Sequence, residues 1–376
     1  QGPILGVGLR AEDQIWVRTG CELSYARAYA AGTDIAVQAN VSGATGQGDA
    51  TDLYISLNLI FQGVPIPAGD VAICWCSSLG QNCSDMDLTP GSTSSVYLEV
   101  TVGTFTIEGP GTGAEIGCYL GQVCRPQLPR DGAKNLKPND ALSAMESCGD
   151  GNFLPGLPYE GIATTSDGYN FEFLNSSGSP YVATYPGYFR LCWCRPSNYL
   201  NCDQPSDFTV AAGLFVAQGP YSGQTHACNL GSQCIVSSTE LRGVGLESGD
   251  KLMPMVSCDP LLGPSRNFPA VPVVGQVAGS NHYFDLGELG LNGTRTEVLE
   301  LCWCSGGWTC EGAQYRQVAM TLYVNCPPGW YELQDATSET SGSLCQECPV
   351  GYYCPGGLSA PLTSCPVGSI SPRGAA

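Results

Sequence analysis

Three short stretches of the chain alternate large apolar residues with smaller or polar ones: VAICWC (71–76), FRLCWC (189–194) and LELCWC (299–304). The first, third and fifth residues of each are large and apolar, and the fifth is always tryptophan (Trp75, Trp193 and Trp303). The second is Ala, Arg or Glu, and the fourth and sixth are cysteine. Because successive side chains of a strand point to opposite faces, the pattern predicts a half-buried strand, with the tryptophan as its core anchor and the cysteines on its outer face.

A second pattern precedes each of these strands. The segments LRAEDQIWVRTGC (9–21), LKPNDALSAMESC (136–148) and LESGDKLMPMVSC (246–258) share Leu at the first place, Asp at the fifth and Cys at the thirteenth. Taken alone, the middle segment would also suit a short helix capped by Asn139 or Asp140. Its counterparts contain an internal proline, Pro254, or a β-branched and aromatic run, so we expect strands in all three.

Two further signatures show that the chain is built from copies of one unit. CYLGQVC (118–124) returns as CNLGSQC (228–234), and VTVGTFTIEGP (100–110) matches VAAGLFVAQGP (210–220). Agreement across four separated signatures predicts three tandem copies, at 1–110, 111–220 and 221–325.

Each copy is expected to be an all-β sandwich of immunoglobulin-like size. The chain has 49 glycines and 27 prolines, which suits about seven short, mostly antiparallel strands joined by turns. The tyrosine corner of immunoglobulin domains is absent, because Ala72, Arg190 and Glu300 occupy the corresponding places. Homology to immunoglobulins therefore does not follow.

The 21 cysteines indicate an oxidising compartment and a framework of disulfides. The two cysteines of CxLGxxC are missing together from the first copy, which suggests the bonds Cys118–Cys124 and Cys228–Cys234. We favour the short loops Cys76–Cys83, Cys194–Cys202 and Cys304–Cys310, which leave Cys21–Cys74, Cys148–Cys192 and Cys258–Cys302 as the long-range bonds. Exchange of the two cysteines of Cys-Trp-Cys is an alternative that spacing leaves open.

Residues 326–376 have a different composition. They contain five cysteines, few apolar residues and the unit Cys-Pro-x-Gly at 326–329, 348–351 and 365–368. Such a segment cannot bury a core and needs disulfides, of which Cys326–Cys345 is predicted. The pairing of Cys348, Cys354 and Cys365 stays open, with one partner expected elsewhere. The segment resembles the ephrin-receptor-like cysteine-rich module, a ladder of small disulfide loops.

The LCWC copies and this module together resemble large extracellular cysteine-repeat proteins of alveolates and flagellated algae. In that group such modules occur in cell-surface proteins and in flagellar hair (mastigoneme) proteins. The resemblance implies a structural or adhesive role: a subunit of a filament or surface coat that assembles with copies of itself or related chains. The alternative is an adhesin or receptor ectodomain that binds a glycan or protein through variable loops such as 262–283. No initiator Met or signal peptide is present, so we expect part of a longer secreted polypeptide.

Charge and glycosylation motifs agree with an extracellular chain. The net charge of −19 disfavours nucleic acid and anionic lipid as partners. The sequence contains no run of eighteen apolar residues, the length that would predict a membrane span. Four sequons predict N-linked glycans, at Asn40, Asn82, Asn175 and Asn292.

Metal and catalytic sites are not favoured. Only Cys345 and Cys348 have the C-x2-C spacing of zinc or redox sites, and neither His226 nor His282 recurs between copies. GVGLRA (6–11) lacks the βαβ unit of a dinucleotide site. We therefore expect no enzyme and no cofactor. The recurring Asp13, Asp140 and Asp250 are weak calcium candidates; without EF-hand spacing, capping a turn through backbone amides is the favoured role.

Overall fold

The protein is described here by a computed structural model, and it is almost entirely β. The structure describes residues 14–18, 35–37, 40–41, 55–56, 68–76, 100–173, 181–197, 200–259, 265, 268, 273–278, 281–290, 296–307, 309–311, 314–333, 343–357 and 361–376. Within these ranges the helical segments are two three-residue 3-10 turns, η1 (Tyr159–Gly161) and η2 (Pro205–Asp207). The predicted all-β class is confirmed.

Three main sheets, each centred on one predicted copy, account for most of the strands. One strand of the predicted third copy, Gly243–Val244, joins the second sheet. The first has the order β2 (Ile35–Val37), β1 (Gln14–Arg18), β5 (Gly69–Cys76) and β6 (Val100–Ile107), with a separate pair of β3 (Asn40–Val41) and β4 (Ile55–Ser56). The second runs β10 (Phe171–Glu172), β9 (Ile162–Thr165), β8 (Ala141–Met145), β11 (Gly187–Cys194), β12 (Val210–Pro220) and β15 (Gly243–Val244), with β7 (Ala114–Tyr119) also beside β12.

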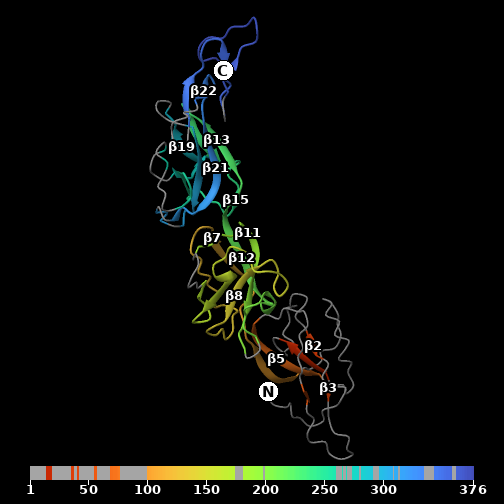
Figure 1. Cartoon of the computed structure of the whole chain (residues 1–376). Helices are drawn as coiled ribbons and strands as arrows, with labels where there is room; N and C mark the ends of the chain where they lie inside the picture. Colours follow the sequence, from red (N-terminus) through yellow and green to blue (C-terminus); the bar gives the residue numbers. More distant parts are fainter. Residues whose placement is uncertain are drawn as a thin grey trace, which may run out of the picture.

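The third copy contains two sheets. One has the order β13 (Thr225–Asn229), β21 (Gln317–Asn325), β20 (Glu297–Cys304), β16 (Lys251–Met255) and β17 (Val273–Val274); the other has β14 (Gln233–Ser237), β19 (Asn281–Glu288) and β18 (Gln276–Ala278). The tail forms the pairs β22 (Trp330–Leu333) with β23 (Leu344–Glu347) and β24 (Tyr352–Tyr353) with β25 (Thr363–Ser364). The sheets and the tail succeed one another along the molecule (Figure 1).

The same pairing recurs around each Cys-Trp-Cys strand. β5, β11 and β20 each lie between the strand of the upstream signature (β1, β8 or β16) and the next long strand of the copy (β6, β12 or β21). The residue after each recurring aspartate pairs with the second cysteine, in Gln14 with Cys76, Ala141 with Cys194 and Lys251 with Cys304. A register shift precedes the first cysteine each time, at Cys74, Cys192 and Cys302. The upstream segments are therefore strands, as predicted, and the helical alternative for 139–148 is wrong.

The strand before CxLGxxC adds a parallel edge. β7 runs parallel to β12, and β13 runs parallel to β21. Each edge strand leads directly into its CxLGxxC loop. The loop therefore lies near the carboxyl end of the last long strand of its copy, from which the chain continues into the next unit. The copy boundaries at 110, 220 and 325 stay predictions.

The tryptophans anchor the core as the alternation predicts. Trp193 and Trp303 are buried beside Leu191 and Leu301 on the same face of their strands. The side chain of Trp75 lies outside the described residues. Burying a side chain of this size contributes about 2–3 kcal/mol or more in area terms, so these positions dominate the core of each copy.

The expectation that the cysteines lie on an outer face is wrong. Cys192 and Cys194 are buried in a second cluster with Met145 and Phe208, and Cys302 and Cys304 are buried beside Tyr315. Their disulfide partners hold neighbouring segments over this face of the sheet. The strand is therefore half-buried in its first part and covered on both faces where the sulfurs lie.

The layer opposite the main sheet differs between copies. In the third copy, Val236, Phe284 and Leu286 of the second sheet belong to the same core as Trp303, as in a sandwich. In the second copy, irregular segments cover the main sheet instead of a second sheet, and they contribute Leu128 and Val182 to the core. The predicted loop 262–283 contains β17, β18 and the start of β19.

Eight disulfides join described cysteines, and seven are pairs that spacing favoured. These are Cys118–Cys124, Cys148–Cys192, Cys194–Cys202, Cys228–Cys234, Cys258–Cys302, Cys304–Cys310 and Cys326–Cys345. The eighth, Cys348–Cys354, belongs to the tail. Cys21–Cys74 and Cys76–Cys83 fall outside the described residues. A bond across 44 positions, as in Cys148–Cys192, stabilises by about 4 kcal/mol in the chain-entropy treatment.

The tail repeats one turn three times. Gly329, Gly351 and Gly368 have φ of 85°, 86° and 93°, which glycine adopts at little cost, and each turn closes with a backbone hydrogen bond to the proline carbonyl of its Cys-Pro-x-Gly unit. Cys348 bonds to Cys354, six residues on. The residue six places after Cys365 is Ser371, and Cys365 has no disulfide partner among the described residues.

We predict that non-reducing peptide mapping recovers these eight bonds, because most of the bonded cysteines are buried and so shielded from disulfide exchange. Alkylation before reduction should label Cys365 among the described cysteines. Peptides that join Cys148 to Cys194, or Cys258 to Cys304, would contradict the pairing.

Candidate functional site at the ends of the tandem copies

Two of the recurring aspartates, Asp140 and Asp250, lie at the ends of their sheets, near the neighbouring copy. Asp140 and Asp250 are buried, and one carboxylate oxygen of each accepts a backbone N–H three residues upstream, from Lys137 and Glu247, at 2.9 Å in both cases. Each aspartate thus closes the turn before its strand, the role favoured from the sequence. Asp13 lies outside the described residues.

The second carboxylate contact differs between the two copies. Asp140 accepts hydrogen bonds from Nε and Nη2 of Arg195 at 3.0 and 3.1 Å, whereas Asp250 accepts the backbone N–H of Gly306 at 2.9 Å. Burial raises the pKa of the Asp250 carboxyl, which has no cation bonded to it in these contacts. In both copies the described contacts of the carboxylate are thus with groups of the protein itself.

Arg195 also connects the second copy to the first. Its guanidinium lies 5.0 Å from the centre of the Trp193 ring, donates to the carbonyl of Asn135 at 2.8 Å and pairs with the carboxylate of Glu108. Glu108 also pairs with Lys137 at 3.0 Å. Arg195 therefore bonds both Asp140, which is buried in its own copy, and Glu108, which lies near the end of the predicted first copy.

Further contacts of this joint are also charged. Asp70 of the first copy pairs with Lys134 of the second at 3.0 Å, and the backbone of Lys134 pairs with that of Gly109 at 2.9 Å in both directions. Hydrogen bonds from Thr106 and Lys134 lower the pKa of Asp70, and a hydrogen bond from Lys137 lowers that of Glu108. We call this set of contacts the charged joint.

The joint between the second and third copies uses other chemistry. The side-chain amide of Gln122 is buried and donates to the carbonyl of Gln314 at 2.9 Å. The rings of Tyr119 and Trp303 have centroids 6.5 Å apart, and the guanidinium of Arg316 lies 4.0 Å from the centre of the Tyr181 ring. We call this the packed joint. Sequence reasoning missed it, although Tyr119 and Gln122 fall inside the CxLGxxC signature.

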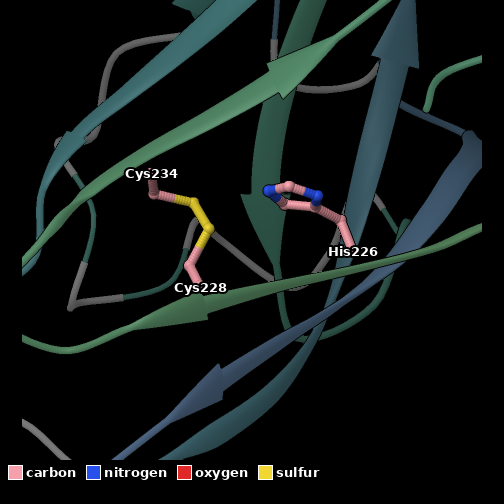
Figure 2. Close-up of side chains that lie close together, drawn as sticks. All are labelled: His226, Cys228 and Cys234. Carbon is pink, nitrogen blue, oxygen red and sulfur yellow. A yellow bond between two sulfur atoms is a disulfide. The ribbon is translucent and has the colours of Figure 1, made fainter. Parts of the chain in front are cut away.

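Two groups of described residues bring three possible metal ligands together. Figure 2 shows the first, in which the ring of His226 lies near the bonded sulfurs of Cys228 and Cys234; the second is Cys258, Glu300 and Cys302. Both cysteine pairs are disulfides, so their sulfurs are not the thiolates that bind zinc. His226 pairs with Glu240 at 3.0 Å, and Glu300 accepts the N–H of Cys258 at 2.7 Å.

The glycosylation motifs are described only in part. Asn40 lies in β3, where its backbone pairs with Ser56, rather than in a turn. Asn82, Asn175 and Asn292 lie outside the described residues. In the part of the chain that the structure describes, no helix has the length and apolar character needed to cross a bilayer.

Fold and cysteine pattern together define a class: a disulfide-rich, all-β protein that repeats one cysteine-containing unit. Within this class, the chain is similar to cysteine repeat modular protein B of Toxoplasma gondii, with 26% identity over 152 residues. The match covers 40% of this chain but 2% of that protein, so the chain spans a small part of its relative. No protein-family model matches the chain.

We predict that Asp140→Asn destabilises the protein more than Asp250→Asn. Both variants lose one carboxylate oxygen that accepts hydrogen bonds, but only Asp140→Asn also removes an ion pair, the one between Asp140 and the partly buried Arg195. Asp250→Asn, in contrast, relieves the cost of burying a charge. The free energies of unfolding should differ by about 1 kcal/mol. Equal losses in calorimetric unfolding would contradict this account of the two aspartates.

We also predict that salt loosens the charged joint and spares the packed joint. At about 1 M salt the Debye length falls to about 3 Å, which screens exposed ion pairs. Because the pKa values of Asp70 and Glu108 are lowered in the folded protein, the contribution of these carboxylates is present above their ordinary pKa of about 4 and is lost as pH falls through the lowered values. The protection of backbone amides at 108–110 and 133–137, measured against their intrinsic exchange rates at the same pH, should therefore fall in salt and in acid.

The matched control for this experiment is Glu108→Gln, which keeps the shape of the side chain and should weaken the salt response. An equal response at 314–317, in the packed joint, would show that the two joints do not differ in this way.

Proposed function

We propose that this chain is a segment of an extracellular, non-enzymatic structural protein, a subunit of a mastigoneme-like filament or of a surface coat. The observation that carries the proposal is the end-to-end succession of sheets (Figure 1). Disulfides bond the second and third copies internally, and side-chain contacts hold each copy to the next. A covalently cross-linked rod suits a load-bearing or adhesive role outside the cell, where disulfides persist.

The similarity to a cysteine repeat modular protein supports an extracellular cysteine-repeat protein. The proposal adds a filament to this. Copies of this chain, or related chains, associate end to end or side by side without closing into a ring. N-linked glycans at the four sequons belong to the proposal, and no metal ion, cofactor or nucleic acid does.

Negative-stain imaging of native material tests the proposal. A filament subunit should appear in fibres with an axial repeat, which reductant disrupts. Dispersed elongated monomers that bind glycan or cell-surface protein in a pull-down would contradict the filament and favour an adhesin. Hydrolytic or redox turnover of a substrate by the purified chain would contradict the non-enzymatic role.

A further inference from the structure

The two CxLGxxC loops, 118–124 and 228–234, have one backbone shape. Leu120 and Leu230 each donate their N–H to the last strand of their copy at 2.9 Å, to Gln218 and Asn325 respectively. The next residue of each loop, Gly121 or Gly231, donates to Val182 or Leu289 at 2.7 and 2.6 Å. Each loop is closed by its own disulfide. Shape therefore does not distinguish them.

Their surroundings do distinguish them. Gly121 and Gln122 are buried against the third copy, whereas Gly231 and Ser232, at the equivalent places, are exposed. The second and fifth places of the loop are Tyr119 and Gln122 in the second copy, but Asn229 and Ser232 in the third. The hydroxyl of Ser232 donates back to the carbonyl of Asn229 at 2.7 Å, so it bonds within its own loop.

The surface that receives the loop of the second copy is the tryptophan end of the third copy. Trp303 faces Tyr119, and the carbonyl of Gln314 accepts the amide of Gln122. Gly121 has φ of +74°, and a Cβ on it would lie 3.3 Å from the backbone nitrogen of Gln317. The approach is thus close enough to require glycine as well as the two side chains beside it.

Among the described residues, the side chains of the third-copy loop make no equivalent contact with the tail. The tail begins at Cys326 and bonds to the third copy elsewhere, where the hydroxyl of Thr296 donates to the carboxylate of Glu332 at 2.6 Å. The hydroxyl of Thr296 also accepts the N–H of Ser343 at 3.1 Å.

We propose that the CxLGxxC loop is the docking element between consecutive copies, and that its second and fifth residues decide whether the next joint is stiff. Tyr119 and Gln122 hold the third copy on the second, whereas Asn229 and Ser232 make no such contact with the tail among the described residues. The partner that the loop fits is the tryptophan end of another copy, which offers a ring and a backbone carbonyl. The inference goes beyond the proposed function, because it holds whether or not the chain forms fibres.

Hydrogen exchange of the intact, oxidised chain tests this without any substitution. The two loops share their backbone hydrogen bonds, so docking alone should separate them. The amides of Gly121 and Gln122 should exchange at least about tenfold more slowly than those of Gly231 and Ser232, as expected when a buried hydrogen bond must first open. Equal rates would overturn the proposal.

The double variant Tyr119→Asn, Gln122→Ser gives the second test, because it transplants the side chains of the third-copy loop. Exchange in 118–124 should rise to the rate of 228–234, and small-angle scattering should show a wider range of molecular dimensions. The matched control Asn229→Tyr, Ser232→Gln should leave exchange in 118–124 unchanged. An intact Cys118–Cys124 bond and unchanged exchange in β8 and β11, which lie in the substituted copy, establish that the variant is folded. A folded variant that retains slow exchange in 118–124 would overturn the proposal.

Discussion

The second and third copies each depend on one strand that is held from both sides. On one face a tryptophan fills the core, and on the other two bonded cysteines hold the segments that cover the sheet. Neither face would suffice alone in copies of about 110 residues with so many turns, because large parts of the chain lie in irregular segments that carry little core of their own. The disulfides limit the freedom of those segments in the unfolded chain, and burial of the tryptophan favours the folded one.

The same strand also sets the chemistry of the joints. Its last residue, Cys194 or Cys304, pairs with the first residue after the aspartate, Ala141 or Lys251. The tryptophan, the aspartate and the residue after the second cysteine therefore lie close together at one end of the sheet in the second and third copies. In the second copy that residue is Arg195, which bonds both Asp140 and Glu108; in the third it is Ser305, and the neighbouring Gly306 bonds Asp250. One architectural position therefore carries an ion pair in the second copy and a backbone hydrogen bond in the third.

Much of this could be read from the sequence because it repeats. Alternation fixed the face of Trp193 and Trp303, and the three aligned signatures favoured strands where Pro254 excluded a helix. The paired loss of two cysteines indicated the bonds of the CxLGxxC loops. The burial of Cys192 and Cys302 could not be read, since alternation shows which face a residue takes but not what covers that face. Nor could the docking role of Gln122, because its partner Gln314 is distant in sequence and carries no pattern of its own.

Calorimetric unfolding with and without a reductant, beside a parallel sample with a metal chelator, measures what holds these sheets together. If bonded sulfur stabilises the copies, reductant should lower the unfolding temperature by more than about 10 °C and chelator should leave it unchanged. A chain that unfolds on chelation but not on reduction would contradict the account.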